Sequence, residues 1–105
     1  MIGGFNETAV TDDHRNLVSQ HLAAINGQLG ANHGAYTVEK AFTQVVAGQY
    51  IHLHLTAGGQ QVSALFFQPL GNAPATLEKV EQGHTEARNP NWFEFNDLFI
   101  KSLFS

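Results

Sequence analysis

The sequence predicts an α+β fold in which one helix is followed by consecutive antiparallel strands. Between residues 12 and 30, apolar residues recur every three or four positions, which is typical of an amphipathic helix. From residue 36 to residue 67 the chain is rich in β-branched and aromatic residues that alternate with polar ones, which is typical of strands with one buried face. Patterns in this order favour an antiparallel sheet of four or five strands wrapped around one α-helix.

The helix is expected to begin after Thr11. A threonine at this position can cap the first turn, and Asp12 and Asp13 place negative charge where the helix macrodipole favours it. The apolar stripe consists of four residues at spacings of four, three and four: Val18, Leu22, Ile25 and Leu29. Gly27 or Gly30 can adopt the left-handed conformation that ends a helix, so we expect the helix to stop at one of them.

Four strands are expected after the helix, over residues 36–46, 50–56, 62–67 and 75–80. In the first strand one parity carries the apolar side chains, which are Tyr36, Val38, Phe42 and Val46. Lys40 interrupts this pattern. The second strand alternates more regularly, and the run Ala57-Gly58-Gly59 predicts a turn into the third. Prolines and a glycine between residues 69 and 74 then separate the third strand from the fourth.

The composition favours one domain over residues 1–105, because 105 residues of which 43% are hydrophobic suffice for one modest core. Within this domain, we interpret residues 1–10 as an N-terminal trunk and residues 96–105 as a C-terminal extension. Residues 91–104 fit two interpretations, a last strand followed by additional core or a short helix, and both stay open.

Composition also disfavours several classes of function. The chain has no cysteine, which excludes disulfides, zinc-thiolate sites and a thiol nucleophile. A net charge of −4 without a basic run disfavours a nucleic-acid partner. No segment approaches the roughly 20 apolar residues that span a bilayer, so no membrane partner is expected. The N-terminus has neither a charged segment nor a continuous apolar one typical of a leader, and a cytoplasmic location is therefore expected.

The titratable residues do not predict catalysis. The acidic residues are scattered over the helix start, the turns and the tail, so we expect neither an enzyme nor a cofactor. His52 and His54 lie two positions apart on one expected strand, but no third ligand is evident near them. We therefore predict no metal site, and interpret the two histidines as part of a solvated or helix-facing strand surface.

The pentapeptide Gln44-Val45-Val46-Ala47-Gly48 occupies the joint between the first two expected strands. It resembles, residue for residue, the first inhibitory hairpin of the cystatin superfamily. The order of trunk, helix, strands and hairpins is similar to that family over roughly residues 1 to 95. The absence of cysteines and the opening Met1-Ile2-Gly3-Gly4 resemble the stefin, or type 1, branch. The resemblance implies a cystatin-like fold.

The resemblance further implies reversible, tight-binding, competitive inhibition of papain-like cysteine proteases of the cathepsin type. It implies a wedge of three segments: the trunk with Ile2, Gly3 and Gly4, the hairpin with Gln44, Val45, Val46, Ala47 and Gly48, and a second hairpin with Pro69 and Leu70. These residue types suit a cleft, because β-branched valines lose little rotamer freedom on docking and glycines allow close backbone approach. Stefins typically have Leu-Pro where this second hairpin has Pro69-Leu70-Gly71.

Two alternatives use the same fold. One is a cystatin-like module that binds another protein without inhibiting a protease, and the other is a sweet-protein-like or engineered scaffold without a target. The resemblance also implies a monomer that can form a domain-swapped dimer, in which the helix and first strands are exchanged and residues 36–55 become one long strand.

Overall fold

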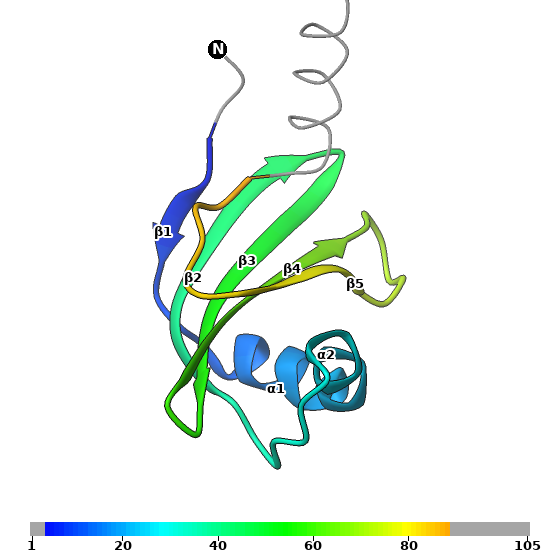
Figure 1. Ribbon diagram of the computed structural model, residues 1–105. Coiled ribbons are helices and arrows are strands. Elements are labelled where there is room, and N and C mark those ends of the chain that lie inside the picture. The colour runs from blue at the N-terminus through cyan, green and yellow to red at the C-terminus, as the bar shows by residue number, and fades with distance from the viewer. Residues whose placement is uncertain (1–3, 89–105) are drawn as a thin grey trace, which may run out of the picture.

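The computed structural model describes residues 4–88 and contains a five-stranded antiparallel sheet and two short helices. In chain order the elements are β1 (Asn6–Thr8), α1 (Asp12–Gln20), α2 (Leu22–Leu29), β2 (Thr37–Val46), β3 (Gly48–Ala57), β4 (Gln60–Gln68) and β5 (Thr76–Gln82). The strands lie in the order β1-β2-β3-β4-β5, and each pairs with the next (Figure 1). The predicted α+β fold is confirmed. The 96–105 extension and the strand or helix considered for residues 91–104 lie outside the described residues.

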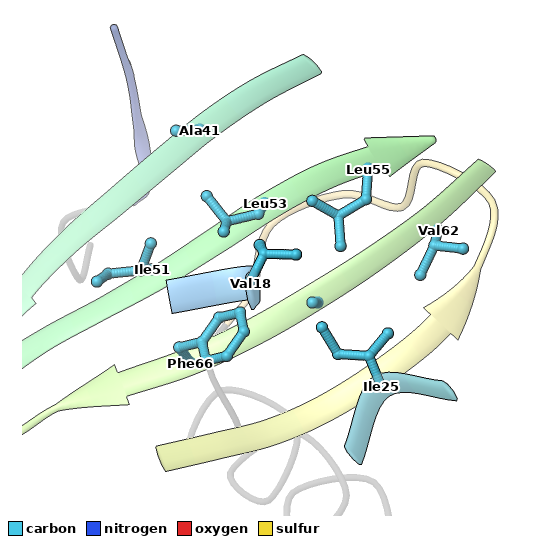
Figure 2. Packing of buried hydrophobic residues seen from close by; sticks show 9 residues of the cluster. Val18, Ile25, Ala41, Ile51, Leu53, Leu55, Val62 and Phe66 are labelled. Atoms are coloured by element: carbon cyan, nitrogen blue, oxygen red, sulfur yellow. The ribbon is translucent and has the colours of Figure 1, made fainter. Parts of the chain in front are cut away.

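The core lies between the helices and one face of the sheet. Val18 of α1 and Ile25 of α2 are buried against apolar side chains of the central strands (Figure 2). The strand residues of this cluster are Ala41, Ile51, Leu53, Leu55, Val62, Ala64 and Phe66. Burying a large apolar side chain contributes about 1.5 to 3 kcal/mol, so this layer contributes substantially to the stability of the fold. We call this face of the sheet the inner face.

The predicted single helix is divided in two at His21. Its start is as predicted: the Thr11 hydroxyl accepts a hydrogen bond from the backbone N–H of His14, and the His14 ring accepts one from the Thr11 N–H in return. At His21, where the first helix ends, the ring donates to the Leu17 carbonyl at 2.9 Å, and the same carbonyl accepts the His21 backbone N–H at 3.2 Å. The second helix ends at Gly30, which has a φ of +65°.

The sequence did not predict β1, which lies within the segment interpreted as a trunk. Asn6, Glu7 and Thr8 pair antiparallel with residues 41–43 of β2. All three residues are exposed, so the strand has no apolar alternation from which it could be recognised. Its pairing fixes the direction in which the chain before residue 6 leaves the sheet.

A β-bulge changes which side chains of β2 are buried. The pairing with β3 shifts between Val38 and Lys40, next to the interruption predicted at Lys40. The extra residue reverses the side-chain parity, so Val38 and Ala41 both face the core. The prediction that Phe42 shares a face with Val38 is therefore wrong. Phe42 lies on the opposite, outer face, where its ring contacts those of His52 and His54.

The outer face is crossed by residues 83–88, which we call the strap (the last coloured segment in Figure 1). The rings of His52 and His54 both donate to the Thr85 carbonyl, at 3.2 and 2.9 Å. The Ser63 hydroxyl donates to the Gly83 carbonyl and accepts from the Thr85 N–H. His52 is only 5% exposed, so the prediction of a solvated or helix-facing surface is wrong for this residue. The two histidine rings instead hold the strap against the outer face through these hydrogen bonds.

Within residues 4–88, no helix combines the length and the apolar character that crossing a bilayer requires.

Candidate functional site

The strand register brings the predicted site segments to one end of the sheet. β2 and β3 meet in a tight hairpin whose tip is Ala47, because Val46 pairs with Gly48. Gln68, where the second loop begins, pairs with Gln49 just beyond this tip. Asn6 pairs with Thr43, so Gly4 and Phe5, which precede β1, lie toward the same end. Figure 1 shows β1 beside β2. We call this end the loop edge: Gly4, residues 44–48 and residues 68–73.

Of the trunk residues predicted for the site, Gly4 is described and is exposed, while Ile2 and Gly3 lie outside the described residues. Phe5, which the sequence analysis did not single out, is half-buried, and its ring lies 6.2 Å from that of His52 on the outer face. Residues 5–8 of the trunk are therefore held beside the sheet by the pairing of β1 and by this aromatic contact. The sequence contains one signal for the role of Phe5, which is a large apolar residue between two glycines and a polar segment.

The first hairpin separates into exposed and buried residues. Val45 is 80% exposed and Val46 37%, and Ala47 is exposed as well. Gln44 and Gly48 are buried, so they shape the hairpin and do not form its outer surface. Three of the five residues predicted here are thus available to a partner, and the other two support them.

Gly48 is constrained by both its backbone and its surroundings. Its φ is +118°, a conformation that side chains other than glycine rarely adopt. A Cβ at this position would lie 2.6 Å from the Gln68 carbonyl oxygen and 2.8 Å from Cζ of Phe67. The requirement for glycine therefore comes from β4 within the same molecule, because a side chain at this position would meet Phe67 and Gln68.

The second loop has an exposed apolar tip, and hydrogen bonds of the Gln68 side chain hold its two ends together. Leu70 is 75% exposed and Pro69 is half-buried. The Gln68 side-chain amide donates to the Ala73 carbonyl at 2.7 Å, across the loop, and also to the Pro69 carbonyl at 3.3 Å. Gly71 has a φ of +83°, which allows the tight turn. The amide bonds restrict a loop that has no regular backbone pairing of its own.

The loop edge concentrates the exposed apolar surface of the described residues. Val45, Val46 and Leu70 are the exposed large hydrophobic residues of residues 4–88, and all three lie on these two loops. Neither loop carries a charged side chain. An uncharged, apolar projection on an otherwise polar surface is typical of a surface that binds a partner.

A polar hollow lies on the inner side of this end. It has a volume of about 450 Å³ between the start of α1 and strands β2 to β4, and its polar lining includes Thr11, Asp13, His14 and Gln49. Its lining holds one carboxylate, that of Asp13, and no pair of acids. The ring nitrogen Nδ1 of His14 accepts from the Thr11 backbone N–H and so serves the helix cap. Among residues 4–88, no three His, Asp or Glu side chains are placed to hold a metal ion. The loop edge is therefore the better candidate.

Comparison with known proteins supports the fold. No protein-family model and no curated protein matches the sequence. Among solved structures, the chain is similar to a secreted type 1 cystatin from Fasciola hepatica, with a TM-score of 0.64 and 17% identity over 81% of this chain and the whole of that one. The chain has the cystatin fold. The predicted cystatin-like architecture is thus confirmed, and the similar structure belongs to the type 1 branch that the sequence resembles.

The same comparison contradicts the predicted cytoplasmic location. The similar cystatin is described as secreted, so a type 1 cystatin fold is compatible with secretion. The prediction took the absence of a charged and an apolar N-terminal segment as a sign of the compartment, and the similar secreted structure overturns it. Core packing and strand register determine the fold, and neither depends on the compartment in which the protein acts.

Proposed function

We propose that this protein is a reversible, tight-binding, competitive inhibitor of papain-like cysteine proteases and not an enzyme. The observation that carries the proposal is the loop edge itself. The exposed large apolar residues of the described chain lie on its two uncharged loops, and the trunk leaves the sheet at the same end. The cystatin fold also supports the proposal. The pentapeptide at residues 44–48 resembles the first inhibitory hairpin of the cystatin superfamily, and in this fold it forms a hairpin.

In the proposed mechanism the loop edge enters the protease cleft as a wedge. Val45, Val46 and Leu70 would leave water and pack against the apolar walls of the cleft. This burial would contribute binding free energy in proportion to the apolar area removed from water. The hairpin backbone is already paired between β2 and β3, so little conformational entropy is lost on binding. Ile2, Gly3 and Gly4 would extend the contact into neighbouring subsites, where residues without a Cβ let the trunk pass close to the reactive centre.

We further propose that the targets are of the cathepsin type and that the monomer is the active form. In the domain-swapped dimer expected as a possibility from the sequence, β2 and β3 would join into one strand. The hairpin tip at Ala47 would then no longer exist, so the swapped form would lack its main contact.

The proposal predicts nanomolar or tighter inhibition of papain, with substrate competing against the inhibitor. The measurement is a titration of papain activity at several substrate concentrations. Val45→Asp should weaken inhibition more than about tenfold, because it would place a charge in an apolar cleft. Gln61→Asp, an exposed residue at the opposite end of the sheet, is the matched control and should leave inhibition unchanged. Full papain activity at micromolar concentrations of folded protein would contradict the proposal and favour the non-inhibitory binding module.

Leu70→Ala is expected to weaken inhibition by about 1 kcal/mol, or roughly fivefold. The effect is smaller than for the first hairpin because the second loop lacks strand pairing at its tip and differs from the stefin pattern at Gly71. Inhibition constants for the wild type, Leu70→Ala and Asn72→Ala would measure it. Asn72 is an exposed polar residue of the same loop, and its substitution should change little. If Leu70→Ala proves more damaging than a substitution at Gly48, the assigned order of the two loops is wrong.

A further inference from the structure

The ring of Phe67 covers Gly48 on the outer face of the sheet. Phe67 pairs across the strands with Tyr50, and their ring centroids lie 5.0 Å apart. Instead of standing upright, the Phe67 ring leans over the hairpin, since a Cβ on Gly48 would lie 2.8 Å from its Cζ and 3.1 Å from its Cε1. An aromatic ring that covers a glycine on the neighbouring strand fills the place of the missing side chain and stabilises that pairing.

The residue after Phe67 reaches the second loop. The Gln68 carbonyl lies against Gly48, and the Gln68 side chain donates to the Ala73 carbonyl across the loop. Two consecutive residues of β4 therefore contact both loops, one through its ring and the other through its amide. This arrangement joins the tip at Ala47 and the tip at Leu70 through a few short contacts.

We propose that Phe67 is a positioning residue that holds the first hairpin in a fixed relation to the second loop. The inference rests on the proposed function, because a fixed relation matters only if both loops dock together. Two loops that are already positioned lose less conformational freedom on binding than two that move independently. Phe67 is partly exposed, whereas Leu65, two residues earlier on the same face, is 4% exposed.

Leu65→Ala is the matched control for Phe67→Ala. Leu65 lies on the same strand and face, one pleat farther from the loop edge, where it pairs with His52. We expect Phe67→Ala to raise the inhibition constant about tenfold or more, and Leu65→Ala to raise it less than about threefold although it also lowers the unfolding midpoint. If inhibition by the two variants falls in proportion to their stability, Phe67 acts only through packing and the proposal is wrong.

A double-mutant cycle tests the contact itself. Gly48→Ala displaces the hairpin, so Phe67→Ala should add little in that background, and the combined loss should be smaller than the product of the two single losses. Losses that multiply would contradict the coupling.

Amide hydrogen exchange provides a readout that needs no protease. In Phe67→Ala the amides of Gly48 and Gln49 should exchange faster, while those of the turn at Gly58 and Gly59 should be unchanged. This outcome would support the positioning role even if the wild type proved inactive against papain, in which case only the proposed function would fail. Unchanged exchange at Gly48 and Gln49 would overturn the positioning role even if papain were inhibited.

Discussion

Replacing Gly48 with glutamate is expected to weaken inhibition by about 2 kcal/mol or more, which is roughly a thirtyfold higher inhibition constant. Two effects combine at this position. A side chain at a φ of +118° is strained, and its Cβ would lie 2.6 Å from a backbone carbonyl that cannot move without moving β4. The hairpin must therefore shift, and Val45 and Val46 shift with it. Inhibition constants against papain for the two proteins would measure the loss.

Gly59→Glu is the matched control for this substitution. Gly59 also has a positive φ, +79°, but no atom lies within 4 Å of the Cβ position, and its turn is at the opposite end of the sheet. The control should therefore suffer backbone strain without displacing the loop edge, and it should inhibit like the wild type. Equal inhibition by Gly48→Glu and the wild type, with native circular dichroism for both, would show that the hairpin tip does not contact the protease.

The elements that could be predicted from the sequence are those whose signal is local. The helix cap at Thr11, the end at Gly30 and the turn at Gly58 and Gly59 each depend on the chemistry of a few neighbouring residues. The pentapeptide from Gln44 to Gly48 was recognised for the same reason, and it forms the tight hairpin between β2 and β3 as expected.

The features that could not be predicted depend on contacts between distant segments. The bulge next to Lys40 reverses the parity of β2, and only the pairing with β3 reveals this. The short β1 is recognisable only from its partner strand. The burial of Gly48 has the same origin, because the atoms that exclude a side chain there belong to Phe67 and Gln68, about twenty positions away in the sequence. Residue type alone could not separate the buried residues of the hairpin from its exposed ones.

His52 makes the stability of this fold depend on pH. Its pKa is lowered to about 4, first by burial, which disfavours the charged ring, and then by the neighbouring His54, with a smaller contribution from His84; the Thr85 carbonyl and Glu81 act in the opposite direction. In the unfolded chain the same ring titrates near 6.5. The unfolded state therefore takes up a proton at a higher pH than the native state, and the free energy of unfolding must fall as the pH decreases from about 6.5 to about 4.

The expected loss over this pH window is about 3 kcal/mol, a large part of the 5 to 15 kcal/mol that stabilises a typical domain. Urea unfolding at pH 7 and pH 4 would measure it, and a pH titration of the His52 ring by NMR would give the native pKa directly. His52→Gln removes the titrating ring but keeps a side-chain donor for the Thr85 carbonyl that holds the strap. Its stability should therefore fall less steeply than that of the wild type between the two pH values. Parallel pH profiles for the wild type and His52→Gln would show that burial under the strap does not govern the acid sensitivity of the fold.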